Sequence, residues 1–498
     1  MRLLRPAWKD PRIGLGIAAA VAGIDGLVSG WWIPRGPITT GEALATIAVS
    51  LLVGGVAGLV ARSRWATLLA PVAFVAVYEL VRLSAQGPTV DAIHVGSLYG
   101  WMALAMGRGF HGLVALFPMA LGAALGAALG RRVNGSVAAR GMAIVARRAA
   151  TAALAISLGL LVVGIARPAN TDPILGPEGE PLPGSVAELT RLEIGGHDLA
   201  MMIRGRSVDD PVLLFLAGGP GGTELGAMRR HLESLEEDFV VVIFDQRGTG
   251  KSHDQLEPTS TLTLDNAVGD VLDVTGYLRK RFGEDKIYLV GQSWGTTLGV
   301  LAVQRAPQLF RAFVGVGQMV SQRETDRIFY EDTLAWARET GNAGLVDTLT
   351  DNGPPPYEDT LDYEALLSHE MNMYPYNHSQ NSEGAGQMSE NLFVEEYSLT
   401  EQIHTLGATM DVFSILYPQL QDIDFRTDAI RLGVPVYLVQ GRYEAPGRAE
   451  LAQEWFRILE APSKEMVVFE TSGHRPLFEQ PDLFHQFMTE AVLAETMP

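Results

Sequence analysis

The 498-residue sequence contains no cysteine, which excludes disulfide bonds, thiolate metal sites and a cysteine nucleophile. Its ten histidines are scattered along the chain, and no group of them has the spacing of a metal site. We therefore expect neither a metal nor another cofactor.

The chain has two parts, and each contains few charges of one sign: acidic residues are few in the first part and basic residues are few in the second. Residues 1–167 contain only five Asp and Glu against 15 Lys and Arg, a net charge of +10. Residues 168–498 contain only 23 Lys and Arg against 52 Asp and Glu, a net charge of −29. The contrast predicts two domains in two environments. The acidic part lacks the basic surface that nucleic-acid binding requires, so we expect no nucleic-acid partner.

The first 167 residues contain five apolar stretches that can each cross a hydrocarbon core ~30 Å thick, which takes about 20 helical residues. The stretches lie near 13–33, 43–61, 65–83, 111–130 and 149–166. A weaker stretch, 93–106, is interrupted by His94 and glycines, and we expect it to be interfacial or re-entrant. The sequence thus predicts a transmembrane helical domain over 1–167 and a Pro- and Gly-rich linker over 168–185.

The basic residues of this domain predict its orientation. They gather before the first stretch, between the second and third, and between the fourth and fifth. The positive-inside rule then predicts a cytoplasmic amino terminus and places the part after Arg167 outside the cytoplasm. We expect an integral membrane protein of the plasma membrane. A sixth span over 91–110 would reverse that last prediction.

Small residues recur every four positions in the fourth stretch, at Gly122, Gly126 and Gly130. Such a face lets two helices approach closely. We interpret it as packing within one chain rather than as a dimer contact, and the sequence leaves the oligomeric state open.

From residue 186 onward, short apolar runs alternate with helical patterns, which predicts an α/β fold with a mainly parallel sheet covered by helices on both faces. The expected strands are 191–194, 201–204, 212–216, 240–244, 287–290, 313–316, 434–439 and 466–469. Residues 319–430 are too many for a loop, so we expect an inserted helical cap there. The cap divides the core into 186–318 and 431–498.

Ser293 lies in Gly291-Gln292-Ser293-Trp294-Gly295, between an expected strand and an expected helix. G-x-S-x-G in this setting is typical of a nucleophile elbow, where the serine occupies a strained turn and small neighbours let strand and helix approach. A serine hydroxyl needs a base to remove its proton, and the base needs a carboxylate to orient it.

In proteins with this elbow, the acid and the histidine follow the serine in that order. His474 follows the last expected strand in a loop, whereas His485 lies within the expected helix 482–494 and is typical of a surface or packing residue. Glu444 follows the strand at 434–439 directly, and its alternative interpretation is a solvated loop charge. We therefore predict Ser293, His474 and Glu444 as nucleophile, base and orienting acid.

The tetrahedral oxyanion needs two backbone N–H donors. One is expected from Trp294, which follows the serine, and the other from Gly219 in the glycine-rich loop after the strand at 212–216.

Five motifs together resemble the proline iminopeptidase branch of the α/β-hydrolases: Gly218–Gly222, Asp245–Ser252, Gly291–Gly295, Gly441–Glu444 and Ser472–His474. The resemblance covers about residues 186–498 and implies the α/β-hydrolase fold and the same catalytic roles for Ser293, His474 and Glu444. Ala217 stands where the family usually has His, and Glu444 where it usually has Asp. The membrane domain lies outside the resemblance.

In that family, acidic side chains of the cap help to select a free amino terminus. Glu324 and Glu331 are the candidates in this chain for substrate binding, with a solvated helix face as the alternative. We predict a membrane-anchored serine hydrolase that acts as an aminopeptidase on short peptides. A carboxylesterase or lipase acting on esters, and a non-catalytic sensor or scaffold with a hydrolase fold, remain open. The expected partners are a small peptide or ester substrate and the lipid bilayer.

Overall fold

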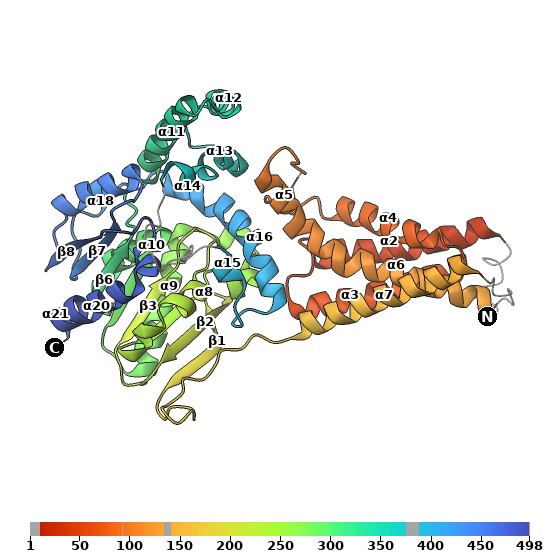
Figure 1. The fold of residues 1–498 in the computed structure, drawn as a ribbon, viewed down its shortest axis with the longest axis horizontal. Coiled ribbons are helices and arrows are strands. Elements are labelled where there is room, and N and C mark those ends of the chain that lie inside the picture. The colour runs from red at the N-terminus through yellow and green to blue at the C-terminus, as the bar shows by residue number, and fades with distance from the viewer. Residues whose placement is uncertain (1–9, 92, 134–140, 375–387, 498) are drawn as a thin grey trace. The chain divides into compact units, whose positions relative to one another are not determined.

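The computed structural model describes residues 10–91, 93–133, 141–374 and 388–497 (Figure 1). The chain divides into two compact units. One comprises Met1–Pro168 with Ser398–Gly407, and the other comprises Ala169–Tyr397 with Ala408–Pro498.

The first unit is helical. Its helices before residue 168 are α2 (Pro11–Trp32), α3 (Thr40–Ala61), α4 (Ala66–Val81), α5 (Leu98–Leu104), η2 (Ala105–Gly109), α6 (Phe110–Val133) and α7 (Met142–Ala166). Among the described residues, four helical segments are long and apolar enough to cross a membrane: Pro11–Trp32, Thr40–Ala61, Leu98–Val133 and Ile144–Ala166. The third predicted stretch corresponds to α4, which has only 16 residues.

The weak stretch 93–106 does not form a separate element. Its second half belongs to the helical segment Leu98–Val133, which continues through the predicted fourth span. The 36 residues of this segment amount to roughly 54 Å of helix, longer than a hydrocarbon core. The segment also contains a π-helical turn, Ala105–Gly109.

The glycine stripe of α6 packs against α3 within the same chain. A Cβ atom at Gly122 would lie 2.1 Å from the carbonyl oxygen of Leu51, and one at Gly126 would lie 2.0 Å from that of Gly55. Gly54 of α3 is equally close to α6, because its Cβ would lie 1.9 Å from the carbonyl oxygen of Met119. The two backbones therefore touch along a reciprocal seam of small residues.

The second unit contains an eight-stranded sheet among the described residues, in the order β1-β2-β4-β3-β5-β6-β7-β8. The strands are β1 (Val186–Ile194), β2 (His197–Gly205), β3 (Val212–Leu216), β4 (Val240–Phe244), β5 (Ile287–Gln292), β6 (Phe310–Val316), β7 (Val436–Gly441) and β8 (Lys464–Phe469). β2 pairs antiparallel with β1 and β4, and all later pairs are parallel. This confirms the predicted fold class, an α/β fold with a mainly parallel sheet.

Apolar side chains cover both faces of the sheet. In β3, Leu214 and Leu216 join the core on one face, whereas Leu213 and Phe215 join the core on the other. The first core is completed by α9 (Leu264–Phe282), α10 (Trp294–Arg305) and α18 (Pro446–Ile458). The second is completed by α8 (Leu225–His231), α20 (Pro481–Phe487) and η9 (Met488–Leu493). Strands buried on both faces explain why their sequences are uninterrupted apolar runs.

The segment between β6 and β7 is helical over its described residues. Its elements are α11 (Gln322–Glu339), α12 (Ala343–Asn352), η7 (Thr360–Tyr363), α13 (Glu364–Leu367), α14 (Glu370–Met373), α15 (Met388–Leu392), α16 (Leu399–Leu416), η8 (Tyr417–Leu420) and α17 (Phe425–Asp428). The segment leaves from the carboxyl end of β6, the edge at which parallel sheets carry their ligand sites.

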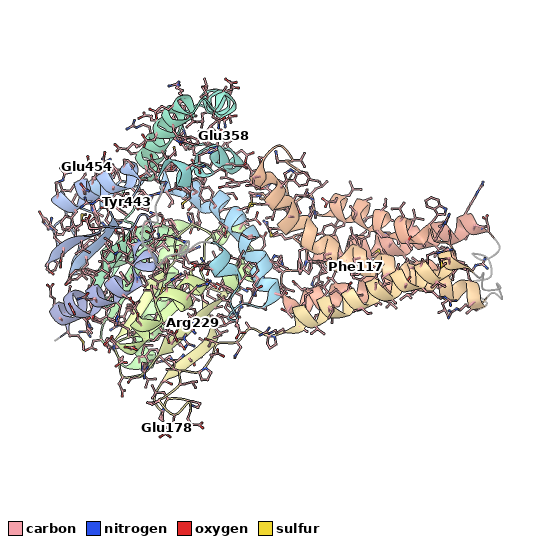
Figure 2. The ribbon with its side chains drawn as sticks, in the orientation of Figure 1. Phe117, Glu178, Arg229, Glu358, Tyr443 and Glu454 are labelled. Atoms are coloured by element: carbon pink, nitrogen blue, oxygen red, sulfur yellow. The ribbon has the colours of Figure 1, made fainter. Side chains whose placement is uncertain are left out.

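Acidic side chains lie on the surface of the second unit. Glu178, Glu358 and Glu454 are exposed, as Figure 2 shows. The linker is tied to this unit at its start, because the buried Arg204 side chain donates to the Thr171 hydroxyl at 2.7 Å and to the Asp172 carbonyl oxygen at 2.6 Å.

Candidate active site

Ser293 stands at the turn between β5 and α10, at the carboxyl end of a central strand. Its backbone has φ 52° and ψ −119°, a region that residues with a side chain rarely adopt. A Cβ at Gly291 would lie 2.4 Å from the carbonyl oxygen of Gly295, and a Cβ at Gly295 would lie 2.1 Å from that of Leu216. The two outer glycines of G-x-S-x-G are thus required by close backbone contacts within the elbow and with β3.

His474 and Glu444 lie in the loops that follow β8 and β7. The Nδ1 atom of His474 is 2.6 Å from Oε2 of Glu444. Glu444 has a side chain only 1% exposed, whereas that of His474 is 16% exposed. Because a carboxylate accepts the proton at Nδ1, Nε2 is the ring nitrogen left to receive a proton from a nucleophile.

The histidine loop is held next to the elbow. The side-chain amide of Gln292, the residue before Ser293, donates to the carbonyl oxygen of His474 at 3.1 Å. Among the described residues, the Ser293 hydroxyl makes no hydrogen bond. Catalytic hydrogen bonds are often long in a resting site and shorten only when substrate is bound.

The carboxylate of Glu444 has two further hydrogen-bond partners. Its Oε1 accepts from Nε of Arg448 at 2.8 Å and from the Ala445 N–H at 2.8 Å. Burial alone would raise the pKa of Glu444, but the charges and hydrogen bonds of Arg448 and His474 outweigh burial and hold that pKa at about 2. Glu444 is therefore ionised, and its carboxylate is shared between the imidazole of His474 and the guanidinium of Arg448.

Arg448 was missed by the sequence reasoning. It lies four residues after Glu444, near the start of α18, and Glu444 itself stands just before the helix. That spacing was the available signal, and only the fold shows that the arginine contacts the predicted triad.

The two predicted oxyanion donors border the elbow. The Trp294 N–H is the first of α10, so it has no acceptor within the helix. Gly219 has φ 138° in the loop after β3, and its N–H has no hydrogen-bond partner among the described residues. A Cβ at the preceding Gly218 would lie 3.4 Å from Cβ of Ser293, which places this loop against the serine.

A buried carboxylate that the sequence reasoning also missed ties this loop to the histidine loop. Oε2 of Glu224 accepts from the Gly218 N–H at 2.9 Å, and its Oε1 accepts from Nη2 of Arg475 at 2.5 Å. Arg475 directly follows His474. Glu224 thus joins the loops that carry a predicted oxyanion donor and the predicted base.

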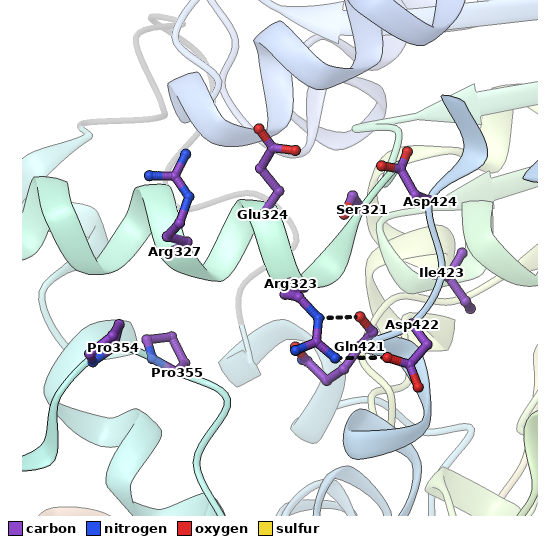
Figure 3. A pocket seen from close by; sticks show the side chains of 10 residues that line it. All are labelled: Ser321, Arg323, Glu324, Arg327, Pro354, Pro355, Gln421, Asp422, Ile423 and Asp424. Carbon is purple, nitrogen blue, oxygen red and sulfur yellow. Dashed lines mark hydrogen bonds and ion pairs between the residues drawn. The ribbon is translucent and has the colours of Figure 1, made fainter. Parts of the chain in front are cut away.

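The two cap glutamates lie in α11 and are both paired. Glu324 accepts from Nη2 of Arg426, and Glu331 pairs with Arg327 at 2.5 Å on an exposed helix face. Glu324 and Arg327 line an open pocket of about 720 Å³, and Glu331 is not among its lining residues (Figure 3). The substrate-binding role of both glutamates stays a prediction.

His485 lies in α20 with Nε2 2.8 Å from Oδ2 of Asp238, and so away from the triad contacts. In the part of the chain that the structure describes, no group of three or more His, Asp or Glu side chains is arranged to hold a metal ion.

Comparison with known proteins identifies the family. The family model described as "alpha/beta hydrolase fold" matches residues 211–481. The chain belongs to the α/β-hydrolase family. This confirms the α/β-hydrolase fold that the sequence motifs predicted, while residues 1–168 lie outside the match.

Curated relatives with similar sequences include proteins named as aminopeptidase and proline iminopeptidase. The chain is 30% identical over 304 residues to the probable aminopeptidase YbaC of Bacillus subtilis (strain 168), covering 60% of this chain and 94% of the relative. It is 23% identical over 284 residues to the proline iminopeptidase of Heyndrickxia coagulans, covering 55% and 86%. The crystal structure of a proline iminopeptidase-related protein from Thermus thermophilus aligns at 21% identity with a TM-score of 0.44, covering 63% and 99%.

Proposed function

We propose that the protein is a membrane-anchored serine hydrolase that releases amino-terminal residues, proline among them, from short peptides. Ser293 is the nucleophile, His474 the general base and acid, and Glu444 the residue that orients the imidazole. The observation that carries the proposal is the 2.6 Å contact between His474 and Glu444, in loops beside the strained turn of Ser293.

In this mechanism the Ser293 oxygen attacks the carbonyl carbon of the first residue while its proton moves to Nε2 of His474. The Gly219 and Trp294 N–H groups donate to the oxyanion that forms. His474 then gives the proton to the leaving amine as the C–N bond breaks, which leaves an ester between the acyl group and Ser293. Water, deprotonated by the same imidazole, hydrolyses that ester and restores the serine.

The choice of peptide over ester substrates is supported by the relatives, which are named as aminopeptidase and proline iminopeptidase. The cap glutamates extend this proposal to recognition of the substrate ammonium group. If either Glu324 or Glu331 binds that group, its replacement by Gln raises KM for a peptide and leaves the hydrolysis of a neutral ester unchanged.

The test is turnover of proline arylamides and p-nitrophenyl esters by the full-length protein in detergent, with labelling by a fluorophosphonate probe. We expect arylamide turnover and labelling in the wild type, and loss of both in Ser293→Ala. Turnover of esters alone would assign a carboxylesterase. Activity that persists in Ser293→Ala would overturn the mechanism, and a wild type that neither labels nor turns over substrate would assign a non-catalytic role.

The membrane orientation forms part of the proposal, with the amino terminus cytoplasmic and the hydrolase unit outside the cytoplasm in the plasma membrane. Arg131 lies beside the end of α3, since its Nη1 donates to the carbonyl oxygen of Arg62 at 3.2 Å. At the opposite ends of the helices, Arg82 and Arg108 both pair with Glu79, at 2.9 and 3.2 Å. The positive-inside rule counts Lys and Arg, and the proposed cytoplasmic ends of the helices carry more of them than the opposite ends do.

A further inference from the structure

Arg448 bridges two carboxylates from different parts of the hydrolase unit. Its Nε donates to Oε1 of Glu444 at 2.8 Å, and its Nη2 donates to Oε1 of Glu370 in α14 of the inserted segment. The Arg448 side chain is 10% exposed, and that of Glu370 is 17% exposed. The guanidinium also lies over the ring of Phe329 in α11, 5.9 Å from its centroid. The arginine is thus clamped between the predicted triad acid and the inserted segment.

We propose that Arg448 is a positioning residue through which Glu370 of the inserted segment sets the pH range in which His474 acts as a base. The inference rests on the proposed function, because it concerns the regulation of that same site.

The two oxygens of Glu444 bind different side chains. Oε2 accepts from His474 at 2.6 Å, while Oε1 accepts from Arg448. The more of the carboxylate charge Arg448 neutralises, the less the carboxylate stabilises a positively charged imidazole. Glu370 opposes this effect, because its own negative charge neutralises part of Arg448. Burial of the group makes each of these interactions stronger than it would be in water.

Other ionisable side chains face this cluster, and none of them is substituted in the variants. Glu479 lies close enough to Glu444 for the two charges to interact, and Arg475 follows His474 and pairs with Glu224. Tyr374, which donates to Asp332, and Tyr417, which donates to Asp326, both interact with the charge of Arg448.

The two partners of the bridge predict shifts of opposite sign. Replacing Arg448 by Met removes a positive charge from beside Glu444, which keeps the Ala445 N–H and His474 as partners. The imidazolium is then favoured, and the acid limb of kcat/KM, which is its fall at low pH, moves to higher pH by about one unit. Replacing Glu370 by Gln leaves the full charge of Arg448 on Glu444, so the acid limb moves to lower pH. Arg448→Lys keeps the positive charge and keeps the limb near the wild-type position. A role limited to packing predicts lower activity without shifts of opposite sign.

The experiment measures kcat/KM between pH 4 and pH 9 for the full-length protein in detergent, using whichever of the arylamide or ester substrates is turned over. The control is Arg457→Met, which removes an exposed arginine from the same helix and leaves the profile unchanged. The proposal would be overturned if the acid limbs of kcat/KM in Arg448→Met and Glu370→Gln coincide with that of the wild type. It would also be overturned if both limbs move in the same direction.

If Arg448→Met does not fold, the pH profiles of Glu370→Gln and Arg448→Lys still test the proposal. An acid limb of Glu370→Gln at or above the wild-type position would contradict the proposal, and so would a shifted limb in Arg448→Lys. Failure of the proposed function is a separate result, in which the wild type itself neither turns over substrate nor reacts with the fluorophosphonate at any pH.

Discussion

Glu444 uses both of its oxygens, one for the imidazole of His474 and one for Arg448 and the Ala445 N–H. A carboxylate accepts at both oxygens, whereas an amide accepts at one and donates at the other. At the residue scale, the proposed mechanism therefore depends on the charge at position 444 as much as on its shape.

Glu444→Gln is expected to lower kcat by about 10³- to 10⁴-fold, because the amide favours the wrong tautomer of His474. The measurement is steady-state kinetics, with the thermal midpoint recorded to show that the variant is folded. A folded variant with a kcat within tenfold of the wild type would exclude Glu444 as the orienting acid.

Glu479 makes a second prediction at this scale, on stability and pH. Burial raises the pKa of Glu479 to about 7, even though the N–H groups of Gly473 and Arg475 donate to it. A carboxyl whose pKa is higher folded than unfolded adds stability when protonated, and that stability is lost as pH rises from the unfolded pKa, about 4.3, to about 7.

We therefore expect the wild type to lose stability relative to Glu479→Gln, by up to about 3 kcal/mol, between pH 4.3 and pH 7. Thermal midpoints of the full-length protein at pH 5 and pH 8 give the result. A difference between the two proteins that does not change with pH would show that Glu479 does not titrate in this window.

At the scale of elements, the α3–α6 seam depends on backbone contact. Gly126→Ala would place a Cβ 2.0 Å from the carbonyl oxygen of Gly55, so the two helices must separate. We expect a loss of about 1–3 kcal/mol, typical of overpacking, seen as a lower thermal midpoint in detergent. Gly112→Ala in the same helix is the matched control, because its Cβ would meet only the Leu116 side chain at 3.8 Å. Equal midpoints for the two variants would refute the seam.

The boundaries of two central strands were predictable from the sequence, whereas β7, predicted over 434–439, lies at Val436–Gly441. The runs at 212–216 and 240–244 were predicted with the bounds that β3 and β4 have, because central strands are apolar throughout. The last strand was predicted from 466, but β8 begins at Lys464. Its first two residues are exposed charges on an edge strand, which carry no hydrophobic signal.

At the scale of the whole molecule, the proposed orientation is testable because the chain has no cysteine of its own. Single cysteines at Ser63, between α3 and α4, and at Glu178, on the exposed surface of the hydrolase unit, provide one reporter for each side. We expect a membrane-impermeant maleimide to label Glu178→Cys in intact cells and Ser63→Cys only after permeabilisation. The reverse pattern would place the hydrolase unit in the cytoplasm.

The sequence by itself determined the family, the alternation of strands and helices, and the apolar helices, because each depends on a local motif or on the length of an apolar run. The assignment of Ser293, Glu444 and His474 followed from chain order and stays a prediction until it is tested by activity. Only the tertiary structure decided what surrounds these residues. Arg448 meets Glu370 across 78 positions and Glu224 meets Arg475 across 251. No local pattern encodes such pairs, because they form only when the sheet brings distant loops to one edge.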